Sequence, residues 1–200
     1  ELRRKLFQVE FLSTNSGALL ITLIYHRPLD TAWQKFATRL ATDLNCQLIG
    51  RSRKQKLVID RHWIEEVLNI EGREFRYWQP EQCFTQPNGG INKKMMSWLL
   101  EHTQQCEGDL LELYCGIGNF TLPLASRFQH VLATELSKPA TEAARWNAEI
   151  NDVGNVEFAR LSAAEMTSAM AGERPYQRLS HLHKSLDQYD LRTLLVDPPR

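Results

Sequence analysis

Two short apolar segments near the start of the chain have the composition of strands. Residues 6–12 and 18–25 are rich in apolar and β-branched residues, and a polar stretch between them is typical of a turn. Asp30 can cap a helix over residues 31–44, where apolar positions recur with the helical period. Two more apolar segments between residues 46 and 60 flank a basic turn and predict a β-hairpin.

A change of composition marks the expected domain boundary. Residues 76–90 contain two prolines and two adjacent glycines, which are typical of a connection between domains. We therefore expect a small α+β central domain at 1–78 and a second domain at 79–200 that is incomplete at its C-terminus. A helix should open the second domain, with one face formed by Ile91, Met95, Trp98, Leu99 and His102.

From Asp109 onward, strand-like and helix-like segments alternate. The expected strands are 110–114, 131–135, 156–160 and 193–196, and the expected helices are 120–128, 138–150 and 163–171. Such alternation predicts a parallel sheet with helices on both faces, which is a Rossmann-like α/β architecture. The polar stretch 172–192 reads as an excursion from the sheet, with a short helix around 181–186.

Composition and charge narrow the class of protein. No apolar run approaches the roughly 18 residues of a membrane span, and we expect a cytoplasmic protein. Four cysteines occur without metal-ligand spacing, which favours separate thiols in a reducing compartment and no metal. The net charge is zero, but residues 1–60 carry ten basic and five acidic side chains. This imbalance weakly favours a polyanionic partner for the first segment.

The strongest local signal is a glycine turn after a buried strand. The segment LLELYCGIGNF runs from apolar residues into Gly116 and Gly118, and a helix should begin near Asn119. Glycines let the backbone turn sharply and let a ligand approach closely, and the start of a helix offers unpaired N–H groups. Taken alone, such a turn is more often a plain connection than a binding site.

An acidic residue in register with the turn changes that balance. Glu135 ends the next strand, 19 residues after Gly116, where a carboxylate can accept hydrogen bonds from ribose hydroxyls. Thr121 replaces the third glycine of a dinucleotide fingerprint, which disfavours a pyrophosphate ligand and suits S-adenosylmethionine. Asp197 lies at the carboxyl end of the last apolar strand, where ligands of open α/β sheets bind.

These motifs together resemble one enzyme family. The ordered segments FTQPN (84–88), LELYCGIGNF, ATE and LLVDPPR are similar to those of the RNA uracil-5-methyltransferases, and most similar to the members that act on tRNA. The resemblance covers the whole chain. It implies a Rossmann-like S-adenosylmethionine-dependent methyltransferase sheet, truncated here, preceded by the small α+β domain.

The resemblance also implies a cofactor site and a reaction. The cofactor S-adenosyl-L-methionine would be held by residues at six positions: Gln86, Tyr114, Gly116, Asn119, Glu135 and Asp197. In the family, a Cys thiolate adds to C6 of uracil, C5 is methylated, and a general base then removes the C5 proton. The nucleophile follows the DPPR motif in the family, and the base lies further on. Neither is expected within these 200 residues, and Cys115 is not expected to be the nucleophile.

The expected partner is tRNA, with methylation of uridine C5 in its T loop. We expect its backbone to contact the basic hairpin formed by Arg51, Arg53, Lys54 and Lys56, although a solvated turn explains these charges equally well.

Other functions stay open. An rRNA uracil-5-methyltransferase is the first alternative, and a non-catalytic tRNA-binding or folding module is an alternative of another class. A cytosine-5 RNA methyltransferase lacks the FTQPN match. An amino-group methyltransferase would have an aromatic residue where Arg200 stands.

Overall fold

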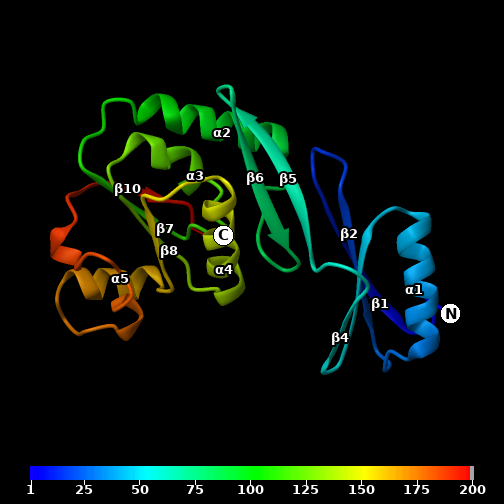
Figure 1. Ribbon diagram of the computed structural model, residues 1–200. Coiled ribbons are helices and arrows are strands. Elements are labelled where there is room, and N and C mark those ends of the chain that lie inside the picture. The colour runs from blue at the N-terminus through cyan, green and yellow to red at the C-terminus, as the bar shows by residue number, and fades with distance from the viewer. Residues whose placement is uncertain (199–200) are drawn as a thin grey trace. The chain divides into compact units, whose positions relative to one another are not determined.

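The computed structural model describes residues 1–198, which fall into two compact units. Unit 1 comprises Glu1–Val67 and Trp78–Gln82, and unit 2 comprises Leu68–Tyr77 and the described residues from Cys83 onward. A hairpin formed by β5 (Trp63–Ile70) and β6 (Arg73–Pro80) contributes residues to both units (Figure 1). This hairpin was not predicted, and the expected boundary after residue 78 falls within β6.

Unit 1 is a four-stranded sheet with one helix. Its elements are β1 (Leu6–Ser13), β2 (Leu19–Tyr25), α1 (Thr31–Asp43), β3 (Gln47–Ser52) and β4 (Gln55–Val58). The strand order is β1-β2-β3-β4, with β2 and β3 parallel and the two outer pairs antiparallel. The predicted strands, helix and basic hairpin are therefore confirmed.

Helix α1 is stabilised at its start by an N-cap and is fixed to this sheet by one large side chain. The Asp30 carboxylate accepts a hydrogen bond from the Trp33 backbone N–H at 2.7 Å, as the sequence predicted. Trp33 is fully buried against the sheet, where it lies over Gly50. A β-carbon at Gly50 would come within 2.3 Å of the Trp33 ring, so only glycine leaves room for the indole.

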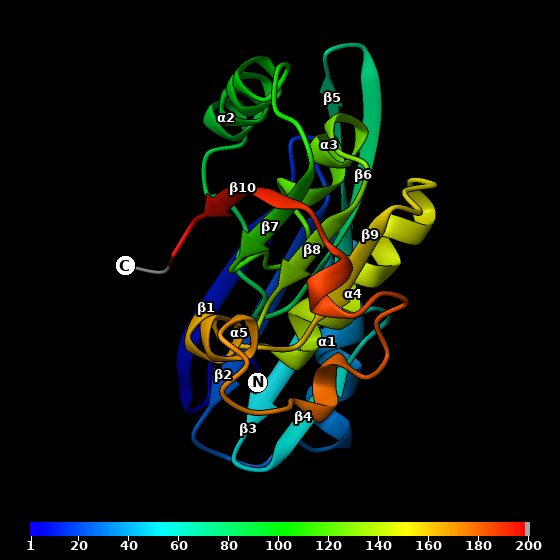
Figure 2. The same ribbon diagram turned by 90° about the vertical axis from the view of Figure 1, so that its left-hand side faces the viewer.

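Unit 2 is built on four parallel strands. They are β7 (Asp109–Leu113), β8 (Val131–Thr134), β9 (Val156–Ala159) and β10 (Leu191–Val196), in the order β10-β7-β8-β9. Figure 2 shows these strands side by side. β7, the first of these strands in the sequence, therefore lies between β10, the last, and β8, the second. The order in which successive strands are added to the sheet reverses beside β7.

Helices and irregular segments cover both faces of this sheet. One face, with Leu110 and Val131, packs against α2 (Gly89–His102), α3 (Thr121–Leu124) and α4 (Lys138–Ile150). The opposite face, with Leu111 and Leu132, packs against α5 (Ala163–Met170) and the segment that follows it. The predicted parallel α/β architecture is confirmed. Among the described residues, no helix is long and apolar enough to cross a membrane.

Three local predictions differ from the structure in whole or in part. The helix expected around 181–186 is absent, and 3₁₀ turns lie instead at Gln177–Leu179 and Leu186–Gln188, because this segment packs its leucines on the sheet without a helical period. The helix expected over 120–128 is only the four-residue α3 followed by a 3₁₀ turn at Ala125–Arg127.

The third difference concerns α2. Its buried residues are Asn92, Met96 and Leu100. On the predicted apolar face, Met95 and Leu99 are partly buried against the core, but Ile91 and Trp98 are about half exposed, at 49% and 55%. The helix is therefore rotated away from the orientation that its largest apolar side chains would favour.

Candidate functional site

The turn between β7 and α3 has an unusual backbone. Tyr114, Gly116 and Gly118 adopt positive φ angles of 62°, 58° and 85°, in the left-handed region. Glycine adopts this conformation freely, but a residue with a β-carbon, such as Tyr114, does so at a cost in free energy. A β-carbon at Gly116 would meet no other atom within 4 Å, so the space above the turn is open.

The backbone of the turn is tied to the neighbouring strand and helix. The Cys115 N–H donates to the Thr134 carbonyl at 3.0 Å, which joins the turn to the end of β8. From α4, the buried Asn147 side chain donates to the Ile117 carbonyl at 3.0 Å. The turn is therefore held in place by contacts outside its own sequence.

Glu135 lies directly beside the glycine turn. Its carboxylate accepts hydrogen bonds from the Gly116 N–H at 3.1 Å and from the Ser137 N–H at 2.7 Å. Two accepted bonds leave further lone pairs on the two oxygens, since an ionised carboxylate has about four acceptor positions. Glu135 thus stands next to the glycine turn with its carboxylate oriented by two backbone groups, and its role toward a ribose stays a prediction.

Gln86 and Asp197 meet although 111 positions separate them in the sequence. The Gln86 side-chain amide donates to the Asp197 carboxylate at 3.1 Å. Asp197 directly follows β10, so Asp197 and Glu135 stand at the carboxyl ends of strands on either side of β7. Pro199 and Arg200 of the same motif lie outside the described residues.

Asn119 does not stand free at the turn. Its side-chain amide forms two reciprocal hydrogen bonds with Asn92 of α2, at 2.9 and 2.8 Å, and its backbone carbonyl accepts from the Tyr77 hydroxyl at 3.1 Å. Neither Asn92 nor Tyr77 was identified from the sequence. Asn92 would have been noticed had the buried face of α2 been predicted correctly, because it is a polar residue one turn before Met96.

A buried carboxyl group lies beneath the turn. Glu112 in the middle of β7 is 2% exposed, and neither its Oε2 nor the Thr121 hydroxyl has a hydrogen-bond partner among the described residues. Burial raises the pKa of Glu112 to about 7; the nearby Thr121 hydroxyl opposes this shift and the Asp197 charge adds to it. The sequence signal is an acid between two leucines of a buried strand, and no role was predicted for it.

Cys115 is unsuited to nucleophilic attack. Its thiol is buried, and burial, followed by the charges of Glu112 and Glu135, holds its pKa well above the ordinary value. Only the thiolate is a good nucleophile, so this side chain stays an inert thiol near neutral pH. The geometry supports the expectation that Cys115 is not a catalytic residue.

The basic hairpin of unit 1 divides into two pairs of side chains. Arg51 and Lys56 both form ion pairs with Glu81, whose side chain is 2% exposed. Burial alone would raise the pKa of Glu81, but the hydrogen bonds from these two cations outweigh it and lower the pKa. Arg53 and Lys54 at the tip are exposed. The structure therefore leaves the two tip residues as the more accessible cations of the four.

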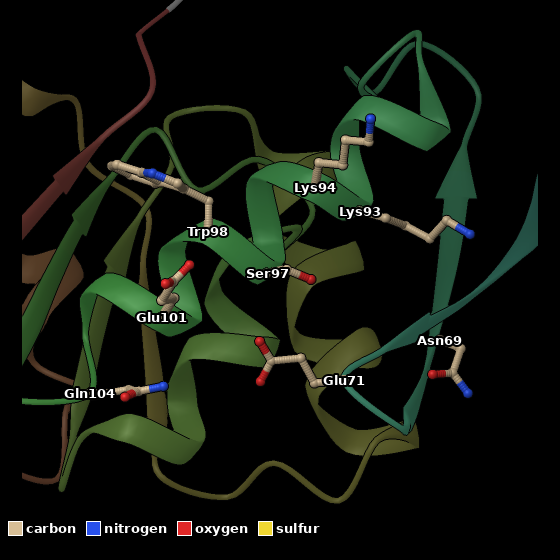
Figure 3. A pocket seen from close by; sticks show the side chains of 8 residues that line it. All are labelled: Asn69, Glu71, Lys93, Lys94, Ser97, Trp98, Glu101 and Gln104. Carbon is tan, nitrogen blue, oxygen red and sulfur yellow. The ribbon is translucent and has the colours of Figure 1, made fainter.

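Two hollows of unit 2 adjoin α2. One, of about 690 Å³, lies between α2 and the β5–β6 turn. It is lined by side chains of both charges, including Lys93, Lys94, Glu71 and Glu101 (Figure 3). It contains none of the predicted site residues. The other, of about 320 Å³, is mainly apolar, runs between α2 and β10, and reaches Asp197.

Solved structures identify the class of fold. The crystal structure of the Pyrococcus abyssi tRNA (uracil-54, C5)-methyltransferase in complex with S-adenosyl-L-homocysteine is 18% identical, with a TM-score of 0.55, and the match covers 75% of this chain and 38% of that chain. A 16S rRNA N2 G1207 methyltransferase from T. thermophilus, in complex with AdoMet and guanosine, is 16% identical with a TM-score of 0.52, covering 78% and 47%. The fold is that of S-adenosylmethionine-dependent methyltransferases, preceded by a small β-rich domain.

Sequence comparison identifies the family. The chain belongs to the tRNA (Uracil-5-)-methyltransferase family, which it matches over residues 1–200. It is 54% identical over 199 residues to a tRNA/tmRNA (uracil-C(5))-methyltransferase of Aromatoleum aromaticum, covering 100% of this chain and 54% of the relative. It is 56% identical over 196 residues to a protein of the same name from Ectopseudomonas mendocina, covering 98% and 54%. The chain thus spans about half the length of these curated relatives.

The raised pKa of Glu112 predicts a pH-dependent stability. Between its ordinary value of 4.5 and about 7, the folded chain keeps a proton that the unfolded chain has lost, so the contribution of Glu112 to stability falls as pH rises through this window. Relative to Glu112→Gln, we expect the wild-type free energy of unfolding to fall by about 3 kcal/mol between pH 4.5 and 7.5. Denaturant titrations at several pH values measure this difference, and parallel profiles for the two proteins would contradict it.

Proposed function

We propose that unit 2 binds S-adenosyl-L-methionine at the carboxyl ends of β7, β8 and β10. One observation carries the proposal: the turn after β7, Glu135 after β8 and Asp197 after β10 lie at one edge of the sheet, with Gln86 bonded to Asp197. The open space above Gly116 suits the close approach of a ligand to the backbone. The proposed cofactor-binding residues are those expected from the sequence: Gln86, Tyr114, Gly116, Asn119, Glu135 and Asp197.

Each side of the site is suited to a different end of this cofactor. Glu135 has free lone pairs next to the turn and would accept hydrogen bonds from the ribose hydroxyls. With the nucleoside on the β8 side, the methionine end would extend toward β7 and β10, where Asn119 and the Gln86–Asp197 pair lie. When bound, the cofactor supplies an electrophilic methyl group.

We further propose that the whole protein methylates C5 of uridine in tRNA, and that the T loop is its target. The support is the family and the names of the relatives, which are tRNA/tmRNA (uracil-C(5))-methyltransferases. The reaction would pass through a covalent Cys–uracil adduct, with the cysteine and the general base outside these 200 residues. The buried thiol of Cys115 agrees with this arrangement.

The first test is a calorimetric titration with S-adenosylhomocysteine. We expect saturable binding by the 200-residue chain, weakened about tenfold or more in Glu135→Ala because hydrogen bonds to the charged carboxylate are lost. Thr38→Ala, an exposed substitution on α1 in unit 1, is the control and should bind as the wild type does. A cooperatively folded chain without saturable binding would contradict the proposed site and favour a non-catalytic RNA-binding module.

The same chain should not transfer methyl groups. Incubated with tRNA and radiolabelled S-adenosylmethionine, it should leave no label on uridine, because the cysteine that attacks C6 is proposed to lie outside these residues. Incorporation of label at uridine C5 by these 200 residues would show that a nucleophile lies within them.

The tip of the basic hairpin is the proposed contact with the tRNA backbone. Replacing Arg53 and Lys54 together by Gln should weaken tRNA binding and lower the slope of log affinity against log salt by about 2, one for each lost phosphate contact. The matched control replaces Lys35 and Arg39 on the exposed face of α1 in the same unit, which removes the same charge.

Arg51 and Lys56 are less suitable for this test. Their removal would leave the buried Glu81 carboxylate unpaired and destabilise unit 1. Equal salt slopes for the wild type and the tip variant would show that the hairpin tip does not contact the tRNA backbone.

A further inference from the structure

The reciprocal amide pair beside the glycine turn is unusually well enclosed. Asn92 is 6% exposed and projects from α2, and its amide both donates to and accepts from the amide of Asn119 at 2.9 and 2.8 Å. The Tyr77 hydroxyl holds the Asn119 carbonyl at 3.1 Å from the β6 side. Asn119 is therefore fixed at its side chain by one element and at its backbone by another.

The pair leaves Asn119 with unused hydrogen-bonding capacity. A side-chain amide has two N–H donors and an oxygen with two lone pairs, and the reciprocal pair uses one of each. The second N–H and the second lone pair of Asn119 keep a fixed direction, because rotation of the amide would break both bonds to Asn92. A polar group held in this way loses little freedom when a ligand binds to it.

We propose that Asn92 is a positioning residue of the cofactor site, which orients the amide of Asn119 toward the methionine end of S-adenosylmethionine. This inference rests on the cofactor site proposed above. Asn92 itself does not touch the ligand. It acts through Asn119, so its removal should matter only where Asn119 makes contact.

Two ligands separate this role from general support of the turn. S-adenosylhomocysteine carries the amino and carboxyl groups of its amino-acid end, whereas 5′-deoxy-5′-methylthioadenosine lacks them but keeps the adenosine. Loss of an oriented Asn119 should weaken binding of the first ligand and spare the second. A collapsed turn would weaken both, because Glu135 also bonds to Gly116.

The experiment measures both dissociation constants by calorimetry for the wild type, Asn92→Ala, Asn119→Ala and the double variant. We expect each single variant to weaken S-adenosylhomocysteine binding about tenfold. The double variant should bind S-adenosylhomocysteine no more weakly than Asn119→Ala does, because both substitutions remove the same interaction with the ligand. Binding of methylthioadenosine should change less than about twofold.

Two controls calibrate these values. Met96→Ala removes a buried side chain one turn further along α2 but keeps both amides of the pair, so it loosens the helix and should leave the ratio of the two dissociation constants unchanged. Glu135→Ala should weaken both ligands, since it acts at the ribose. Melting curves identify any variant that does not fold. If Asn92→Ala does not fold, Asn92→Ser replaces it, because serine also lacks the paired amide but loses less packing than alanine.

Each outcome decides the matter. Unchanged S-adenosylhomocysteine binding in Asn92→Ala, or equal weakening of both ligands, would overturn the positioning role while the cofactor site stands. Additive effects in the double variant would show that Asn92 acts independently of Asn119 and would overturn it as well. A folded wild type that binds neither ligand would overturn the cofactor site itself.

Discussion

The turn after β7 requires three residues in the left-handed region within five positions, and the arrangement of the site follows from how that turn is held. Glycine meets the requirement at two positions, but Tyr114 adopts the same conformation with a side chain. The turn keeps this shape because Thr134, Asn147 and Glu135 each bind its backbone. Local sequence allows the turn, and tertiary contacts select it.

This division explains what could be predicted from the sequence. The parallel sheet was predictable because buried strands and helices have different periods, and Glu135 was predictable because its distance from Gly116 is set by one strand–helix–strand unit. The bond between Gln86 and Asp197 joins distant segments: Asp197 was predictable from its place at the end of an apolar strand, but only the family resemblance pointed to Gln86. The β5–β6 hairpin was missed because the stretch 76–90, which overlaps the end of β6, was taken to mark a boundary for its prolines and glycines.

The polar groups beneath the turn were beyond sequence reasoning for a different reason. Asn92, Tyr77 and Glu112 come from three elements, and no local pattern shows that their side chains converge on one turn. A buried acid or amide within an apolar segment is nevertheless a usable signal, because burying a polar group without a partner is costly. Each such residue indicates a contact that the rest of the fold has to supply.

The orientation of α2 shows how much such a contact can decide. Rotating α2 to bury the exposed halves of Ile91 and Trp98 would gain roughly 0.8–1.5 kcal/mol for each side chain, about half the value for full burial. The same rotation would separate Asn92 from Asn119 and leave buried amide groups unpaired, at about 1–3 kcal/mol for each. The rotation would also expose Met96 and Leu100, which are buried now, so hydrophobicity alone does not determine which face of α2 is buried. The observed orientation keeps the amide pair and leaves Ile91 and Trp98 half exposed, so polar complementarity at the turn balances the apolar pattern of the helix.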